Sequence, residues 1–169
     1  MPELCPPSGA VRPSYVAALR EFHAEGRHLD ADATALADAG AFEDLVDALH
    51  DAELAAATSA PGGVPTTTFW YCDGARYLGR ITLRHRLTDA LRDVGGHVGY
   101  EVRPSARRRG HAGAMLRGVL PAAAALGLER VLLTCDAGNL PSRRVIEGCG
   151  GVLTCESGGV RRYRVPTAR

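Results

Sequence analysis

The chain has 169 residues, with 20 basic residues that are all arginine and a formal net charge of +1. This length suits one domain with its own hydrophobic core. No apolar run approaches the roughly 18 residues of a membrane span, and the opening MPELCPPSG lacks the regions of a signal peptide, so we expect a cytoplasmic protein.

The cysteines and the charge distribution limit the kinds of ligand that we expect. The five cysteines form no CxxC pair and no zinc pattern with the six histidines, so we expect reduced thiols and no metal. Residues 1–60 carry three arginines against eleven acidic residues, whereas residues 61–169 carry seventeen against eight. The basic part suits a polyanionic ligand, while the acidic part either attracts a cationic amine or is a solvated helix face.

The N-terminal segment, about residues 13–60, is predicted to be mostly helical. Ser14 is a candidate N-cap for a first helix, and apolar spacing predicts a second helix from about Ala41 to Ala57. Residues 29–40 between them are ambiguous. Residues 59–65 form a loop by their turn chemistry.

A β-rich hairpin follows the helices. Residues 66–72 and 76–84 are predicted strands joined by a turn at Asp73-Gly74. The alternation of Val98, Tyr100 and Val102 with polar residues or glycine predicts the next strand. Together these three strands make the antiparallel half of a sheet.

The strand 98–102 leads into a basic loop and a long helix. Pro104 marks the strand's end, Arg107–Arg109 form the loop, and Gly110 opens a helix that runs to about Leu126. This turn is suited to bind phosphate, because the helix start has unpaired amides and a favourable dipole. The glycine lets a phosphate approach the backbone closely. A Walker loop is excluded because the chain has no lysine, and the glycines do not fit a dinucleotide fingerprint.

The C-terminal part continues with alternating elements. Residues 130–135 are predicted as a buried strand parallel to the strand 98–102, since a crossover helix bent by Pro121 joins them. Residues 152–156 and 160–165 form a closing hairpin around Gly158-Gly159. We find no linker, so residues 1–169 are predicted to form a single domain.

Two blocks of this sequence resemble a known family. The stretch Arg107-Arg-Arg-Gly-His-Ala112 resembles the acyl-CoA-binding motif (Q/R)-x-x-G-x-(G/A) of the GNAT-type N-acetyltransferases. Asn139, Ser142 and Gly150-Gly151 match a second block of the family, which implies a short helix after Asn139. The resemblance implies an α/β fold with a central mixed antiparallel and parallel sheet flanked by helices. It also implies an acetyl-CoA-binding core over about 66–166 and an acceptor-site wall formed by the N-terminal helices.

The resemblance also implies where acetyl-CoA binds as cosubstrate. Backbone groups of the strand would hold the pantetheine and the acetyl carbonyl, and the amides of Arg108 to Ala112 would hold the pyrophosphate. The implied cosubstrate-binding residues are Tyr100, Glu101, Val102, Arg107, Arg108, Arg109, Gly110, His111, Ala112, Gly113, Asn139 and Ser142.

The catalytic groups are less clear, because Ile146 stands where many members carry the tyrosine that protonates the thiolate. Protonation then falls to water, to Tyr100 or Tyr163, or to the ammonium product. Glu101 and His97 are the candidate bases, and catalysis by positioning alone is the alternative.

These features predict transfer of an acetyl group to a primary amine of a small molecule or peptide, by direct attack. One alternative is an acyl-CoA-binding module without transferase activity. A nucleic-acid-binding protein is disfavoured, since the arginine cluster lacks interleaved aromatic residues. We therefore expect no nucleic-acid and no membrane partner, and the sequence leaves a homodimer open.

Overall fold

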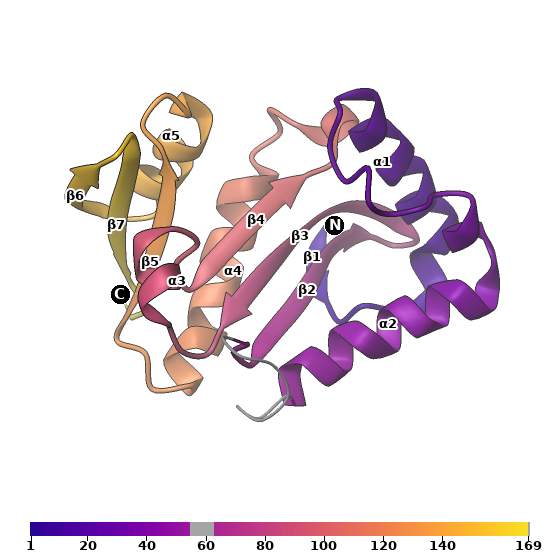
Figure 1. Cartoon of the computed structure of the whole chain (residues 1–169), viewed down its shortest axis with the longest axis horizontal. Coiled ribbons are helices and arrows are strands. Elements are labelled where there is room, and N and C mark those ends of the chain that lie inside the picture. Colours follow the sequence, from indigo (N-terminus) through magenta and orange to yellow (C-terminus); the bar gives the residue numbers. More distant parts are fainter. Residues whose placement is uncertain (55–62, 169) are drawn as a thin grey trace.

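Two antiparallel sheets lie side by side in the computed structural model, which describes residues 1–54 and 63–168 (Figure 1). The first sheet has the order β1 (Glu3–Cys5), β2 (Thr66–Asp73), β3 (Arg76–Arg84) and β4 (Val98–Val102). The second has the order β5 (Arg130–Asp136), β7 (Val160–Pro166) and β6 (Val152–Ser157). The α/β fold class and both predicted hairpins are confirmed. Strand β1 was not predicted, because three residues are too few to show an alternating pattern.

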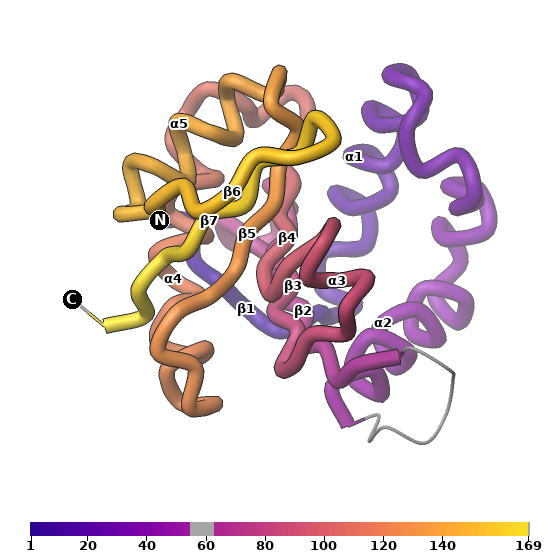
Figure 2. The backbone as a smooth tube through the Cα atoms, turned by 60° about the vertical axis from the view of Figure 1, so that its left-hand side comes forward, coloured from indigo at the N-terminus to yellow at the C-terminus, as the bar shows by residue number. Residues whose placement is uncertain are grey.

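Helices cover both faces of the first sheet. The helices are α1 (Arg12–Ala24), α2 (Ala39–Leu54), α3 (Asp89–Asp93), α4 (His111–Ala125) and α5 (Leu140–Gly148). Helices α1 and α2 lie on one face and α4 on the other, so the sheet is the middle layer (Figure 2). The larger core cluster joins β2–β5, β7, α4 and α5, whereas a second cluster packs α1 and α2 on Trp70 and Tyr77. No helix in residues 1–54 and 63–168 is long and apolar enough to cross a membrane.

The helix starts near the N-terminus differ from the sequence prediction. Ser14 does not cap α1, because the helix begins at Arg12 with Val11 as N-cap. Its hydroxyl instead accepts a hydrogen bond from the Tyr77 amide at 3.0 Å and one from Arg103 at 3.1 Å. The end of the second predicted helix, residues 55–57, lies outside the described residues.

The two sheets meet at His97, immediately before β4. The His97 amide donates to the Leu132 carbonyl at 2.7 Å, and the Leu132 amide donates to Nδ1 of the His97 ring at 2.9 Å. A Cβ on the preceding Gly96, whose φ is +64°, would collide with that same carbonyl. Within the described residues, β4 pairs as a strand with β3 alone. Strands β4 and β5 are therefore joined at this junction but form no ladder, since a side chain takes the place of the next backbone partner.

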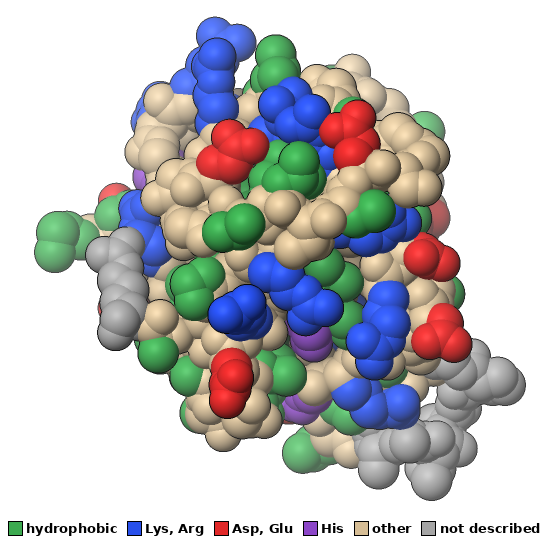
Figure 3. All heavy atoms as spheres, turned by 90° about the vertical axis from the view of Figure 1, so that its left-hand side faces the viewer, with side chains coloured by type: hydrophobic (Ala, Val, Ile, Leu, Met, Phe, Trp, Pro, Cys, Tyr) green, Lys and Arg blue, Asp and Glu red, His purple; other side chains and the backbone are tan. Residues whose placement is uncertain are grey.

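Burial and positive charge keep the His97 ring neutral. The side chain is buried, and burial lowers the pKa of His97 to about 4, with further lowering from Arg164, Arg92 and Arg84. Basic side chains gather on the face of the molecule formed around β6, β7 and α3 (Figure 3). A neutral ring with Nδ1 as acceptor is the form that the Leu132 amide requires.

We predict that stability falls as the pH is lowered from about 6.5 towards 4. In this window the unfolded chain binds a proton at His97 and the folded chain does not, so the free energy of unfolding decreases with decreasing pH. This histidine would contribute up to about 3 kcal/mol of the decrease. Urea denaturation of the wild type and of His97→Gln at several pH values measures it. Equal pH slopes in the two proteins would contradict the prediction.

We also predict that Gly96→Ala destabilises the protein by roughly 2 kcal/mol or more, because it adds a clash to a left-handed backbone. The matched control is Gly138→Ala, at which a Cβ would meet nothing within 4 Å and no positive φ is required. Chemical denaturation of both variants measures the difference.

Candidate functional site

The edge of β4 that faces β5 carries unpaired backbone groups. In the ladder with β3, His97 accepts from Arg84 and Arg103 donates to Leu78, so the odd-numbered residues of β4 direct their backbone groups towards β3. Tyr100 and Val102 therefore direct theirs towards the second sheet. The resemblance implied that the Glu101 backbone also holds the pantetheine, but Glu101 lies opposite Arg80 and directs its backbone groups towards β3. Of the three residues expected to hold the pantetheine with their backbone, Tyr100 and Val102 direct main-chain groups away from β3, and the Val102 carbonyl accepts from Arg107.

The chain after β4 forms a tight, basic turn at the start of α4. A 3-10 helix (Pro104–Ala106) is followed by Arg108 with φ +61° and by Gly110 with φ +80°, which is the N-cap. The first helical bond is donated by Ala114 to the Gly110 carbonyl at 3.1 Å, which leaves the amides of residues 111–113 without intrahelical partners. A Cβ on Gly110 would meet nothing within 4 Å. The turn thus combines open space with converging N–H groups, as phosphate binding requires.

The three arginines of this turn have different surroundings. The Arg107 guanidinium forms two hydrogen bonds of 2.7 Å with the Glu25 carboxylate, and its Nε donates to the Val102 carbonyl at 3.3 Å. Arg108 and Arg109 are exposed. His111, in the first turn of α4, lies 5.5 Å from the Tyr71 ring between centroids, and burial lowers its pKa. Arg107 is therefore a positioning residue, whereas Arg108 and Arg109 remain available to an anion.

Helix α1 is tied to β4 and the turn by ion pairs. Glu21 accepts from Arg103 at 2.6 Å and from the Ser105 amide at 3.0 Å, and Glu25 pairs with Arg107. Arginine also lowers the pKa of Glu25. Acidic residues of the N-terminal segment thus fix the phosphate turn to α1, a role that composition did not reveal.

A cavity of about 190 Å³ lies between α1, α2 and the sheet. Its walls are partly aromatic, from Tyr15, Phe22 and Tyr77, and partly charged, from residues that include Asp30, Arg80 and Glu101. Burial raises the pKa of Tyr15 and Tyr77, so both hydroxyls stay protonated. The cavity lies on the α1 and α2 side of β4, so the N-terminal helices line a pocket beside this strand.

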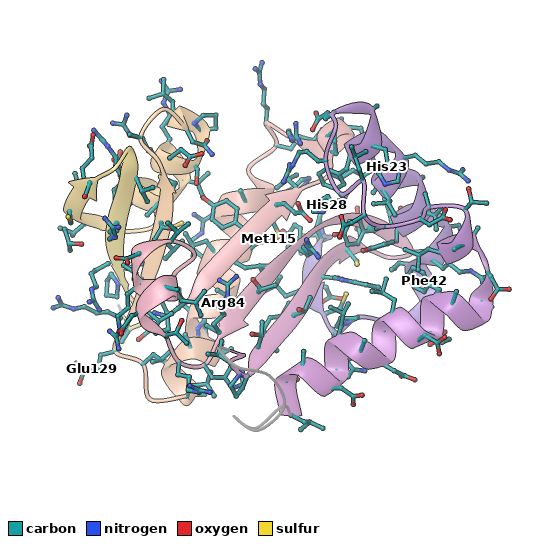
Figure 4. All side chains as sticks on the ribbon, in the orientation of Figure 1. His23, His28, Phe42, Arg84, Met115 and Glu129 are labelled. Carbon is teal, nitrogen blue, oxygen red and sulfur yellow. The ribbon has the colours of Figure 1, made fainter. Side chains whose placement is uncertain are left out.

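The Glu101 side chain points into this cavity and is surrounded by positive groups. Oε1 accepts from Nε of Arg80 at 2.6 Å, and Oε2 accepts from Arg27 at 3.0 Å and from Nε2 of His28 at 2.7 Å. Its side chain is only 11% exposed. His28 lies near the end of β4 beside α1 (Figure 4). Sequence reasoning missed Arg27, His28 and Arg80, because their separation along the chain gave no signal of this cluster.

The residues of the second motif shape the other side of the gap. Asn139 caps α5 by accepting from the Ser142 amide at 3.1 Å, and the Ser142 hydroxyl lies 2.8 Å from the Tyr100 hydroxyl. Burial raises the pKa of Tyr100 to about 12. Asn139 therefore acts on nearby backbone, and the pair Tyr100–Ser142 links β4 with α5 beside the gap.

Two positions that bear on protonation of the thiolate, Ile146 and Tyr163, are buried. Ile146 is buried in the core cluster. The buried Tyr163 hydroxyl donates to Glu147 at 2.9 Å. Among the described residues, no group of three or more His, Cys, Asp or Glu side chains is arranged to hold a metal ion.

Comparison with known proteins identifies this arrangement. A family model described as "Acetyltransferase (GNAT) domain" matches residues 19–152, which is most of the chain. The protein belongs to the GNAT acetyltransferase family. No similar sequence was found among curated proteins.

Solved GNAT structures share the whole fold at low identity. The Mycobacterium smegmatis RimJ, solved with CoA-disulfide, is 19% identical, with a TM-score of 0.67 over 98% of this chain and 81% of that one. RimL, a ribosomal L7/L12 alpha-N-protein acetyltransferase solved with coenzyme A, is 14% identical, with a TM-score of 0.66 over 98% and 93%. The microcin C7 self-immunity acetyltransferase MccE, solved with acetyl-CoA and AMP, is 10% identical, with a TM-score of 0.64 over 98% and 92%. At these identities the likeness establishes the fold.

We predict that Gly110→Asp abolishes acetyl-CoA binding, whereas Gly110→Asn weakens it far less. Both side chains tolerate a left-handed backbone and have nearly the same shape, so the pair differs mainly in the carboxylate charge beside the phosphate turn. Titration calorimetry with acetyl-CoA measures both affinities. Wild-type affinity in Gly110→Asp would show that the phosphates bind elsewhere.

Proposed function

We propose that this GNAT protein transfers the acetyl group of acetyl-CoA to a primary amine of a small molecule or peptide, by direct attack. One observation carries the proposal: one edge of β4 is not paired with β5, and the Glu101 side chain of the same strand lines a cavity. A thioester along the edge and an amine in the cavity would meet at the same strand. Such positioning alone supplies a large part of an acyl-transfer rate, on the order of 7–11 kcal/mol at best.

The cosubstrate would be held mainly by backbone. The pyrophosphate would bind the amides of residues 108–113, and the pantetheine would run along Tyr100 and Val102. A free amide of this edge would stabilise the oxyanion that develops on the acetyl carbonyl. The Arg107–Glu25 pair supports this assignment, because it holds the turn in an open conformation without filling it.

The thiolate of the departing CoA would take its proton from the Tyr100 hydroxyl. The hydroxyl of Tyr100 lies near the gap and keeps its proton, since burial raises its pKa to about 12. Ile146 offers no proton, and Tyr163 donates to Glu147. Of the two candidate bases, Glu101 lines the acceptor cavity, whereas Nδ1 of His97 is occupied at the sheet junction.

The proposal also includes the domain organisation, the location and the partners of the protein. Residues 1–169 would act as a single domain in the cytoplasm, without nucleic acid, membrane or metal. The acceptor class is open between small amines and peptides: RimL acts on a ribosomal protein, and MccE is a microcin immunity acetyltransferase. An acyl-CoA-binding module without activity is the second candidate, favoured by the buried Ile146 at the usual tyrosine position.

We predict tight acetyl-CoA binding and amine-dependent release of CoA. The assay is thiol release from acetyl-CoA with a panel of small primary amines and of peptides with free N-termini, and mass spectrometry identifies the product. Binding by calorimetry with no thiol release from any amine would favour the inactive module instead. Absence of acetyl-CoA binding would refute both readings.

A further inference from the structure

His28 occupies an unusual position at the wall of the acceptor cavity. It follows α1 and has a φ of +54°, a conformation that is costly for a non-glycine residue and persists only when the surroundings impose it. Two contacts impose it here. The ring of His23 donates from Nε2 to the His28 carbonyl at 2.9 Å, and the Phe22 ring meets the His28 ring edge-on at 5.1 Å.

The Glu101 carboxylate fixes which ring nitrogen of His28 carries the hydrogen. An ionised carboxylate only accepts hydrogen bonds, so the 2.7 Å contact with Nε2 requires a hydrogen on Nε2. In the neutral ring Nδ1 is then the acceptor, and the half-buried side chain lines the cavity. A carboxylate that holds one nitrogen of an imidazole in this way prepares the other to take a proton.

Glu101 itself is poorly placed to act as the base. Its two oxygens already receive Arg80, Arg27 and His28 within 3.0 Å. Taking a proton would neutralise the carboxylate that these groups surround. Within the described residues no hydrogen bond engages Nδ1 of the imidazole beside it, and imidazole is the commonest general base in enzymes.

We propose that His28 is the general base that deprotonates the acceptor amine, with Glu101 as the positioning residue that sets its tautomer. The inference deepens the proposed function and depends on it. No motif or sequence comparison assigns a role to this histidine, which lies outside the motif blocks and meets Glu101 only in the fold.

In the proposed reaction, proton transfer to His28 precedes the attack on the thioester. The ammonium group of the acceptor gives one proton to Nδ1 of His28, which becomes an imidazolium. The amine lone pair forms the N–C bond with the acetyl carbon while the carbonyl electrons move to oxygen. When the intermediate collapses, the C–S bond breaks and its electrons go to sulfur. The second amine proton passes to the thiolate by way of the Tyr100 hydroxyl, and His28 returns its proton to water, so the products are amide, CoA thiol and one proton.

Charged groups from four directions face His28 and define the pH test. They are Glu101 on β4, Arg80 on β3, His23 on α1, and Arg27 with Asp30 on the segment that carries His28 itself. We expect kcat/KM of the wild type to fall as the pH is lowered and His28 takes a proton; this decrease is the acid limb of the pH profile. The groups around His28 remain in a His28 variant, so loss of the acid limb would report on His28 itself.

The test uses variants that suit the positive φ. His28→Asn tolerates the left-handed backbone and cannot take a proton, while His28→Gly frees the backbone and leaves room for imidazole. The matched control is His50→Asn, at an exposed position of α2. With acetyl-CoA and 2-phenylethylamine, chosen for the aromatic cavity wall, we expect both His28 variants to lose about 100-fold or more in kcat/KM. Added imidazole should restore part of the rate of His28→Gly, and the control should match the wild type.

A second measurement needs no acceptor. Long-range ¹H–¹⁵N NMR of the wild-type protein should show His28 with its hydrogen on Nε2, and Glu101→Gln should lose this preference. A hydrogen on Nδ1 at neutral pH would overturn the proposal.

The outcomes separate the two proposals. If the His28 variants bind acetyl-CoA as the wild type does but lose turnover and the acid limb, the proposal is supported. If they keep turnover within about threefold, His28 is not the base although the enzyme is an acetyltransferase. If the wild type binds acetyl-CoA but acetylates neither 2-phenylethylamine nor any other amine of the panel, the proposed function fails, and the role of His28 fails with it.

Discussion

The hydrogen-bonded junction between His97 and Leu132 is the constraint on which the rest of the structure depends. Adjacent strands in a sheet satisfy one another's backbone groups, and a fully formed ladder between β4 and β5 would leave none free. Here Nδ1 of the His97 ring accepts the Leu132 amide, and within the described residues the strand pairing of β4 stops at β3. One buried imidazole thus joins the two sheets at one end and leaves the β4 edge open beyond it. Gly96 allows this approach, because any larger residue would strike the Leu132 carbonyl.

Because one edge of β4 is not paired, this short strand presents main-chain groups on that edge and a charged side chain on one face. Main-chain groups of Tyr100 and Val102 face the gap, and the Glu101 side chain faces the cavity beneath α1 and α2. The phosphate turn follows β4 directly, so its distance from the open edge is fixed by only a few residues. Ion pairs from Glu21 and Glu25 hold α1 against that turn. Helix α1, which lines the cavity, and the turn before α4 are therefore held together by ion pairs.

Charge inside this arrangement is balanced locally. Glu101 meets two arginines and a histidine, and Arg103 and Arg107 each meet a glutamate of α1. The strong difference in net charge between the two parts of the chain is thus partly cancelled across their contact. Arg108 and Arg109, beside Arg107 in the same turn, are exposed.

The sequence by itself determined the elements whose signals are local. Turn residues such as Asp73-Gly74 and Gly158-Gly159 set the hairpins, the Gly110 turn set the start of α4, and Asn139 set the start of α5, because each depends on backbone conformations of neighbouring residues. Only the tertiary structure decided the replacement of a β4–β5 ladder by His97, the use of Ser14 inside α1, and the meeting of Arg27, His28 and Arg80 with Glu101. These contacts join residues more than twenty positions apart, so their geometry depends on how whole elements pack, and no spacing along the chain encodes it.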